Sequence, residues 1–272
     1  MEKLRLAIYY LINRVLGPFR LAINKRETLR SLVAGSIELK KITLFLRIAR
    51  ALKVSIIPAE VISNIGSGSR SQLGQDMFAL IVSGFKSDGF FVEFGATDGI
   101  GLSNTYILEK KYAWQGILAE PALHWHKSLT ENRKVSISKL AVFSATGKSV
   151  AFRETRDPEI STISSFSEGD KHAKARKSFK EYQVNTISLE DLLADHNAPQ
   201  IIDFLSMDTE GSEYSILEAF DFSKYMFRAV CIEHNYAEDG TRILSLMESH
   251  GYEQVLPNVS DFDFWFVHKT LL

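Results

Sequence analysis

The spacing of hydrophobic positions changes along the chain. In the first fifty residues, apolar side chains recur every three or four positions, which predicts helices over residues 2–16 and about 28–53. Gly17 and Pro18 separate the two helices, because this pair ends regular structure. Neither segment approaches the roughly 18 to 20 apolar residues that cross a bilayer. We therefore expect both helices to lie on a surface or pack against one.

A Ser- and Gly-rich segment, residues 63–71, is typical of a loop. It predicts a boundary between an N-terminal helical arm, residues 1–62, and a body, residues 63–272. In the body, short apolar runs alternate with helical segments, and each run predicts a buried strand. The five runs are 90–94, 116–119, 135–143, 201–207 and 229–233.

Alternating strands and helices predict an α/β fold, with a mostly parallel sheet and helices on both faces. Two last runs, Glu253 to Leu256 and Phe262 to Val267, predict a C-terminal antiparallel hairpin and bring the sheet to seven strands. Residues 149–153 predict a hairpin partner for the third strand. Residues 155–180 have weak periodicity, which is typical of a long loop with helical pieces.

Composition is ordinary for a globular protein, with 45% hydrophobic and 24% charged residues, but the charges are unevenly placed. Residues 1–53 hold 12 Lys and Arg against 3 Asp and Glu, a net charge of +9, whereas residues 54–272 carry a net charge of -10. A basic amphipathic helix can bind an anionic membrane surface, and it can equally form a helical cap or a dimer contact. We expect a cytoplasmic protein, with attachment to the inner face of the membrane as one alternative. The single cysteine, Cys231, excludes an internal disulfide.

The stretch that carries the chemistry begins with the first strand of the body. The apolar run Phe90 to Phe94 ends at Gly95, and Gly99 follows within the next turn. Glycine lets the backbone approach a ligand closely, so this turn is typical of a ligand site. The next strand ends at Glu120, 25 positions after Gly95, where an acid can accept both hydroxyl protons of a ribose.

The acids around this turn favour one nucleoside cofactor over another. A dinucleotide site needs G-x-G-x-x-G, whereas Glu93 lies inside the strand and Asp98 in the turn. Carboxylates suit the sulfonium and ammonium of S-adenosylmethionine better than a pyrophosphate. The alternative is a plain glycine turn of an α/β protein.

Further polar residues follow the fourth and fifth strands, where ligands bind in an open α/β sheet. We predict Asp208, Glu210 and His234 as catalytic, with Asp208 or His234 as the base that takes a proton from an acceptor hydroxyl. Asp208, Glu233 and His234 could instead hold a divalent cation such as Mg²⁺. The structural alternatives are a hydrogen-bonded histidine and an acid pair at a helix N-terminus.

A run of basic residues within 171–180 has two interpretations. It is either a solvated face or a lid that holds an acidic acceptor through charge-assisted hydrogen bonds. The body as a whole is acidic and has no basic stripe with interleaved aromatic residues, which argues against a nucleic-acid partner.

Taken together, these motifs resemble the FkbM family of S-adenosylmethionine-dependent methyltransferases, over roughly residues 71–268. The resemblance rests on Ser71-Gln72-Leu73-Gly74-Gln75-Asp76, Phe91-Val92-Glu93-Phe94-Gly95-Ala96-Thr97-Asp98-Gly99, Ser103-Asn104-Thr105, Glu120-Pro121, Met207-Asp208-Thr209-Glu210-Gly211-Ser212-Glu213 and Glu233-His234-Asn235. It implies a Rossmann-like class I methyltransferase fold and O-methylation, often of a sugar or a natural-product hydroxyl. The expected acceptor is a sugar or glycan, and the alternatives include an acidic one and a lipid-linked one.

The resemblance also implies a set of cofactor-binding positions. Gly95, Asp98, Gly99 and Glu120 would bind the cofactor, and Ala141 would lie along the adenine. The full set predicted is Gln75, Asp76, Glu93, Gly95, Thr97, Asp98, Gly99, Asn104, Glu120 and Ala141. A non-catalytic scaffold protein that retains the fold is the rival interpretation, and NAD-dependent reduction is disfavoured by the missing G-x-G-x-x-G.

Overall fold

The computed structural model describes residues 25–168, 172–236 and 239–271, so the helix predicted over residues 2–16 lies outside the described residues. Its contacts divide the chain into two compact units, Met1–Lys40 and Lys41–Leu272. Helix α2 (Lys25–Ala51) contributes its last residues to the second unit, where Phe45, Ile48 and Ala49 are buried. The domain boundary proposed at residue 62 stays a prediction.

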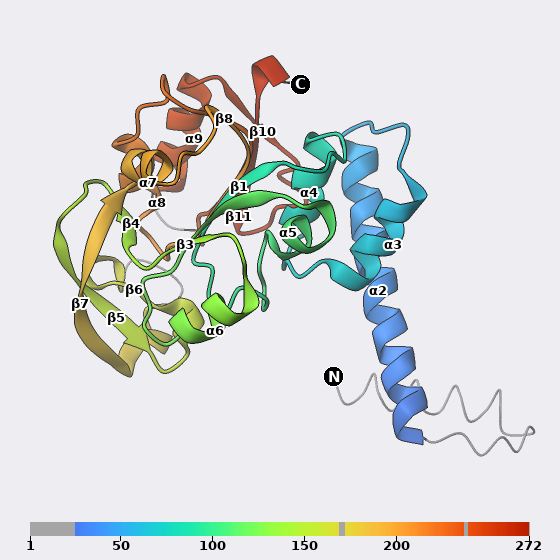
Figure 1. Ribbon diagram of the computed structural model, residues 1–272, viewed down its shortest axis with the longest axis horizontal. Helices are drawn as coiled ribbons and strands as arrows, with labels where there is room; N and C mark the ends of the chain where they lie inside the picture. Colours follow the sequence, from blue (N-terminus) through green and yellow to red (C-terminus); the bar gives the residue numbers. More distant parts are fainter. Residues whose placement is uncertain (1–24, 169–171, 237–238, 272) are drawn as a thin grey trace, which may run out of the picture. The chain divides into compact units, whose positions relative to one another are not determined.

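The larger of the two sheets has seven strands in the order β10-β11-β9-β8-β1-β2-β3 (Figure 1). The strands are β1 (Phe90–Phe94), β2 (Gln115–Ala119), β3 (Ser136–Ser138), β8 (Ile201–Met207), β9 (Met226–Glu233), β10 (Tyr252–Val255) and β11 (Asp263–His268). This sheet is mixed, which corrects the expectation of a mostly parallel sheet with an added hairpin. The reason is that β11 pairs antiparallel with both β9 and β10, and so becomes an interior strand.

Helices cover both faces of this sheet, because successive strand residues point to opposite sides. Phe91 packs in one core with α2 and α3, whereas its neighbour Val92 packs in a second core with α7 and α9. The helices of the first side are α3 (Ala59–Gly68), α4 (Gln75–Val82) and α5 (Tyr106–Tyr112). Those of the second side are α7 (Leu189–Asp195), α8 (Glu213–Glu218) and α9 (Gly240–Ser249).

A second sheet of four strands, in the order β4-β7-β5-β6, was not expected from the sequence. Its strands are β4 (Ala141–Phe143), β5 (Ser149–Thr155), β6 (Thr162–Ile163) and β7 (Phe179–Ser188). The single strand predicted over residues 135–143 is therefore wrong, because its two halves, β3 and β4, belong to different sheets. The strand β7 was missed because its first half is largely exposed and lacks an apolar period.

The segment between β5 and β7 contains three short 3₁₀ turns, η1 (Pro158–Ile160), η2 (Ser164–Phe166) and η3 (Ala175–Lys177). Helix α6 (His126–Asn132) follows β2, and the chain ends with η4 (Lys269–Leu271). The parallel strands β1, β2, β8 and β9 end at one edge of the large sheet. Because β11 runs the opposite way, its first residue, Asp263, pairs with Glu233 at that same edge.

Candidate functional site

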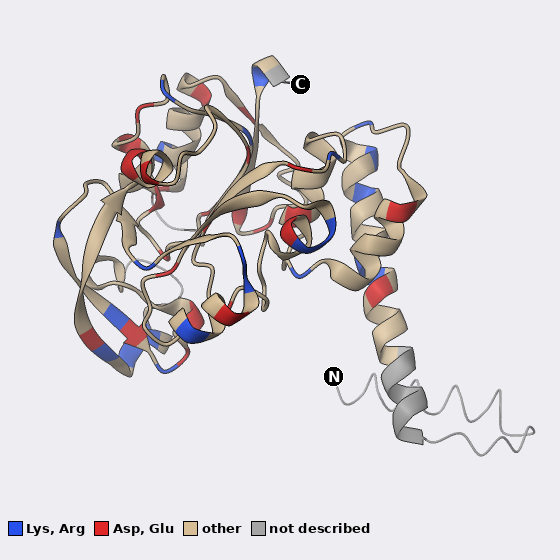
Figure 2. Cartoon of the chain, in the orientation of Figure 1, with Lys and Arg blue, Asp and Glu red and all other residues tan. Residues whose placement is uncertain are grey.

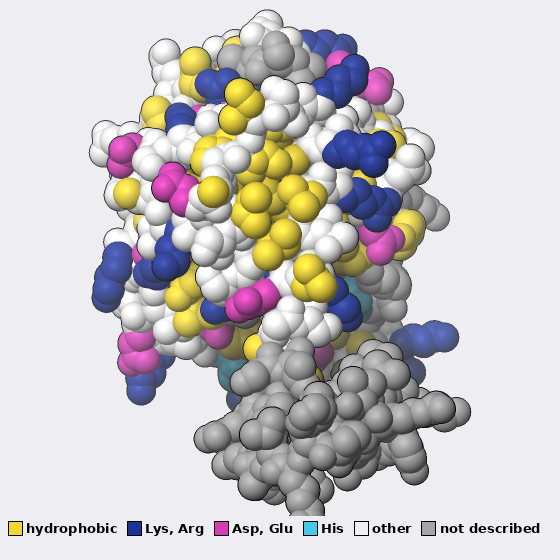
Figure 3. Space-filling view, turned by 90° about the vertical axis from the view of Figure 1, so that its right-hand side faces the viewer, with side chains coloured by type: hydrophobic (Ala, Val, Ile, Leu, Met, Phe, Trp, Pro, Cys, Tyr) yellow, Lys and Arg dark blue, Asp and Glu magenta, His cyan; other side chains and the backbone are white. Residues whose placement is uncertain are grey.

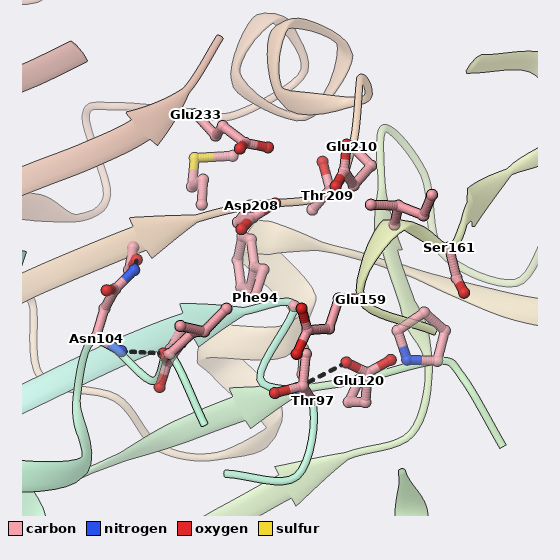
Figure 4. Close-up of a pocket in the computed structure, with 18 of the residues that line it drawn as sticks. Phe94, Thr97, Asn104, Glu120, Glu159, Ser161, Asp208, Thr209, Glu210 and Glu233 are labelled. Atoms are coloured by element: carbon pink, nitrogen blue, oxygen red, sulfur yellow. Dashed lines mark hydrogen bonds between the residues drawn. The ribbon is translucent and has the colours of Figure 1, made fainter. Parts of the chain in front are cut away.

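A cavity of about 400 Å³ lies at the edge where the parallel strands end (Figure 4). Its lining includes the ends of β1, β2, β8 and β9, the loop of residues 101–104, the starts of β4 and β11, and residues 157–161 and 163 of the neighbouring segment. Eight acidic side chains line it, and no Lys or Arg does so among the described residues. The eight acids are Glu93, Glu120, Asp157, Glu159, Asp208, Glu210, Glu233 and Asp263.

The glycine turn predicted after β1 forms one wall of the cavity. Gly95 has a φ of 71°, and a Cβ placed on it would lie 2.2 Å from the carbonyl oxygen of Asp208. Only glycine fits there, because the backbones of β1 and β8 approach so closely. Thr97 also has a positive φ, of 47°, and turns its backbone N–H toward the end of β2.

Glu120 lies at the tip of β2, as predicted, and its side chain lines the cavity (Figure 4). Its two carboxylate oxygens accept the backbone N–H groups of Thr97 at 2.9 Å and Ala122 at 2.8 Å. These bonds fix the carboxylate plane and leave each oxygen a second lone pair. Burial raises the pKa of Glu120 to about 7, and the two N–H donors partly oppose that rise.

Glu93 also lines the cavity, and it orders the loop before α5. It accepts the backbone N–H of Asn104 at 2.6 Å and the hydroxyls of Ser103 and Thr105. Burial raises the pKa of Glu93, and the Arg133 guanidinium 3.7 Å away opposes the rise. Asn104 donates to Ser206, while its Oδ1 is buried and has no hydrogen-bond partner among the described residues.

Gln75 and Asp76, both predicted near the methionine end of the cofactor, have different positions. Gln75 lines the cavity and donates to Asp263 at 2.9 Å. Asp76 is fully buried and is not part of the cavity lining. It accepts hydrogen bonds from Ser69 and Ser71 and from the backbone of Met77, so it joins the preceding loop to the start of α4.

Three other predicted cofactor residues divide in the same way. Ala141 lines the cavity, at the start of β4. Asp98 is not part of the lining, and its Oδ1 accepts the backbone N–H groups of Ile100 and Gly101, both at 2.7 Å. Gly99 packs against Arg133, and a Cβ there would lie 2.5 Å from that side chain. Asp98 and Gly99 therefore stabilise the conformation of the turn without lining the cavity.

Asp208 follows β8, and Glu233 is the last residue of the adjacent strand β9. Their side chains extend into the same space (Figure 4). The two carboxyl groups are hydrogen-bonded to one another. Burial and the neighbouring acids raise the pKa of Glu233 strongly, so Glu233 keeps its proton and donates it to Asp208. Burial raises the pKa of Asp208 to about 7, while the bond from Glu233 acts in the opposite direction.

Glu210 lines the cavity beside Asp208 and Glu233, and the guanidinium of Arg176 offsets its charge. The Nη2 atom of Arg176 lies 2.7 Å from Glu210 Oε2, and Asn235 donates to the same oxygen at 3.3 Å. Arg176 belongs to the basic run within residues 171–180. From the sequence, that run was either a solvated face or a lid. Lys174, Lys177 and Lys180 are exposed, whereas Arg176 is buried and turned inward.

His234 has a different environment from the acids. Its ring stacks on Phe264, with centroids 4.0 Å apart, and its Nδ1 accepts the backbone N–H of Tyr236. His234 is not part of the cavity lining. The predicted catalytic set is thus brought together in Asp208 and Glu210, with His234 outside the cavity.

Carboxylate oxygens of Asp208, Glu210 and Glu233 lie within 4.8 Å of one another. Such oxygens are the ligands that hard divalent cations prefer, so Asp208 and Glu233 of the predicted metal set do meet, joined by Glu210 in place of His234. Arg176 and the proton on Glu233 already offset the charge of this cluster. A cation is therefore not required to explain the cluster.

Sequence reasoning missed several residues of the site. Asp263 gives no signal in the sequence, because it begins the antiparallel strand β11, whereas the predicted site residues follow or end strands. Glu159 and Ser161 lie in the segment interpreted as a loop, and their place in the lining depends on the second sheet.

The chain was compared with family models, with curated proteins and with solved structures. The family model described as Methyltransferase FkbM domain matches residues 93–253. A search of curated proteins found no match. One similar solved structure is methyltransferase FkbM from Methylobacillus flagellatus KT, with 14% identity and a TM-score of 0.41, over 85% of this chain and 60% of that one.

Two further structures are similar at lower scores. Precorrin-6y C5,15-methyltransferase from Geobacter metallireducens GS-15 has 10% identity and a TM-score of 0.37, over 71% of this chain and 85% of that one. A SAM dependent methyltransferase from Aquifex aeolicus has 11% identity and a TM-score of 0.34, over 78% and 97%. These likenesses are too distant to carry an argument about function. The family match spans more than half of the chain and includes the acids of β1, β2, β8 and β9, and the chain therefore belongs to the FkbM methyltransferase family.

Proposed function

We propose that this protein is an S-adenosylmethionine-dependent O-methyltransferase that acts on a hydroxyl of a sugar, glycan or related metabolite. The observation that carries the proposal is the position of Glu120. Its carboxylate is buried in the cavity, oriented by two backbone N–H groups, and has a free lone pair on each oxygen for the two ribose hydroxyls.

A second observation supports the fit of the cofactor. Asn104 Oδ1 is a buried acceptor without a donor among the described residues, and it lies in the lining of the cavity with Glu93. A buried unpaired acceptor is costly, and an ammonium donor would satisfy it. When bound, S-adenosylmethionine supplies an electrophilic methyl group on a cationic sulfonium, which the surrounding carboxylates stabilise.

Asp208 is the residue that we propose as the general base. It lines the cavity, and its pKa of about 7 leaves a large fraction ionised at neutral pH. A base with that pKa can take the proton of an acceptor hydroxyl, which contributes about 10² to 10⁴ in rate. The proton on Glu233 orients the Asp208 carboxylate. Alignment of the hydroxyl by the rigid strand ends supplies a further ~7 to 11 kcal/mol.

The lining favours an uncharged acceptor. An acidic sugar or a phosphorylated one would meet the ionised carboxylates of the lining, besides the protonated Glu233 and the Arg176-paired Glu210, and no Lys or Arg among the described lining residues. Like charges at short range in a buried site disfavour binding. We therefore propose that the acceptor is an uncharged compound with a hydroxyl group. A hydroxyl on an uncharged sugar of a glycan, including a lipid-linked glycan, fits this description.

Calorimetric titration of the folded protein with S-adenosylhomocysteine tests the cofactor. Micromolar binding by the wild type and clear weakening in Glu120→Ala are expected. Glu253→Ala, a change on β10, is the matched control and should bind as the wild type. If the folded wild type does not bind S-adenosylhomocysteine, the proposal fails. A labelled-methyl assay over neutral and acidic glycans then separates an enzyme from a scaffold protein.

A further inference from the structure

Exposed apolar side chains are concentrated near the start of the described chain. Ten large hydrophobic residues are exposed among the described residues, and five of them fall between residues 33 and 56. The other five are spread from residue 102 to residue 236. The five concentrated residues are Val33, Ile37, Leu39, Leu46 and Ile56, with exposed fractions of 41%, 48%, 65%, 44% and 80%. Single exposed apolar residues are normal, but such a concentration indicates an interaction surface.

The second unit carries two of these residues on a well-packed support. Phe45 and Ile48 of α2 are buried in the core, and Leu46 faces away from them. Arg50 lies one helical turn beyond Leu46 and is exposed. Ile56 lies in the connection between α2 and α3. We call Leu46, Arg50, Lys53 and Ile56 the α2–α3 surface.

The charges around this surface are predominantly positive. Residues 33–60 contain five Lys or Arg and two acids, Glu38 and Glu60, so their net charge is +3. Figure 2 shows Lys and Arg along α2, with acidic residues on both α2 and α3, and Figure 3 shows an apolar area with Lys, Arg, Asp and Glu side chains around it on the side that carries α3. Apolar side chains set among cations are typical of segments that lie in the interface of an anionic bilayer.

We propose that the α2–α3 surface binds the surface of an anionic lipid bilayer. Its apolar residues would enter the headgroup region, and its cations would pair with lipid phosphates. A second copy of the chain is the other candidate occupant, but two surfaces of the same net positive charge repel one another. Among the described helices, none is long and apolar enough to cross a membrane.

Sedimentation of the full chain with vesicles tests the proposal. We expect it to pellet with vesicles of equal parts phosphatidylglycerol and phosphatidylcholine, and to stay in solution with phosphatidylcholine alone. The double variant Arg50→Gln/Lys53→Gln should bind anionic vesicles about thirtyfold more weakly. Leu46→Glu/Ile56→Glu should lose at least about tenfold, because it places charge where apolar contact is needed.

Matched controls use the same substitutions elsewhere on the surface. Lys127→Gln/Lys148→Gln and Leu123→Glu change exposed residues outside the α2–α3 surface and should pellet as the wild type. Each variant should melt at the wild-type temperature. Equal pelleting of wild type and Leu46→Glu/Ile56→Glu would overturn the proposal. So would a dimer, seen by light scattering, that this variant abolishes while vesicle binding is absent throughout.

Discussion

The guanidinium of Arg176 lies 2.7 Å from the carboxylate of Glu210, and both side chains are buried. Arg176 belongs to η3, in the segment between β5 and β7, whereas Glu210 follows β8 at the edge of the large sheet. The same guanidinium donates to the carbonyl oxygen of Ile160 at 2.7 Å. Thr162 adds a hydrogen bond to the backbone carbonyl of Glu210 at 2.9 Å. The segment is thus fastened to the turn that carries the acids of the cavity.

Replacement of Arg176 by Met should destabilise the protein by about 3 to 5 kcal/mol, because the Glu210 carboxylate would stay buried without its cation. Chemical denaturation measures this loss. Arg176→Lys should fall between wild type and Arg176→Met, since an ammonium keeps the charge but cannot reproduce the fork of donors. The double variant Arg176→Met/Glu210→Gln should regain much of the loss.

The control is Lys177→Met, one position further along the same turn, where the side chain is exposed. It should change the free energy of unfolding by less than about 0.5 kcal/mol. If Arg176→Met were as stable as Lys177→Met, the pair would not hold the segment in place.

Glu120 predicts a link between cofactor binding and pH. Its pKa is raised to about 7, so the free protein holds a proton there in mildly acidic solution. Ribose hydroxyls donate to the ionised carboxylate, and binding must therefore release that proton. The affinity for S-adenosylhomocysteine should rise up to tenfold per pH unit below about pH 7 and level off above it. Titrations in buffers of different ionisation enthalpy measure the released proton.

Glu120→Gln is the matched variant for this prediction. It retains the shape of the side chain and removes the titration, so its binding should be weaker at pH 8 and independent of pH. Wild-type affinity that does not change between pH 5.5 and 8 would contradict the assignment of Glu120 to the ribose. These pH values bracket the pKa of about 7 on both sides.

The part of this site that could be predicted from the sequence depends on short-range signals. The apolar run Phe90 to Phe94, Gly95 and Glu120 lie within one strand-helix-strand unit, and the chain geometry of such a unit brings its two strand ends together. The same holds for Asp208 and Glu233, which flank adjacent parallel strands. Position after a strand was not sufficient by itself, because His234 directly follows β9 and lies outside the cavity lining.

The rest depends on pairing between distant segments, which the local pattern does not encode. Asp263 reaches the site only because β11 runs antiparallel to β9. Arg176 looks like its exposed basic neighbours in sequence, and its burial follows from the position of Glu210. The break between Ser138 and Ala141, which sends β4 to the second sheet, lies inside a run that alternates like one strand.

Gly95 predicts a stability difference that separates crowding from backbone strain. Gly95 and Gly147 have similar φ angles, 71° and 76°, but a Cβ at Gly95 would lie 2.2 Å from the Asp208 carbonyl, whereas nothing lies within 4 Å at Gly147. Gly147→Ala should cost about 1 to 2 kcal/mol from the left-handed backbone alone. Gly95→Ala should cost a further ~1 to 3 kcal/mol for the clash. Equal melting temperatures for the two variants would show that β1 can move away from β8.

Asp208 as the base predicts the pH profile of methyl transfer. Since only the ionised carboxylate accepts a proton, kcat/KM for the acceptor, measured at saturating S-adenosylmethionine, should rise tenfold per pH unit up to about pH 7 and then level off. Asp208→Asn should lower kcat by about 10² to 10⁴ and leave S-adenosylhomocysteine binding intact. Glu233→Ala removes the donor that lowers the pKa of Asp208, so its profile should shift to higher pH, whereas Glu233→Gln keeps a donor and should shift it less. A profile that is unmoved in Glu233→Ala, or an active Asp208→Asn, would assign the base to another residue.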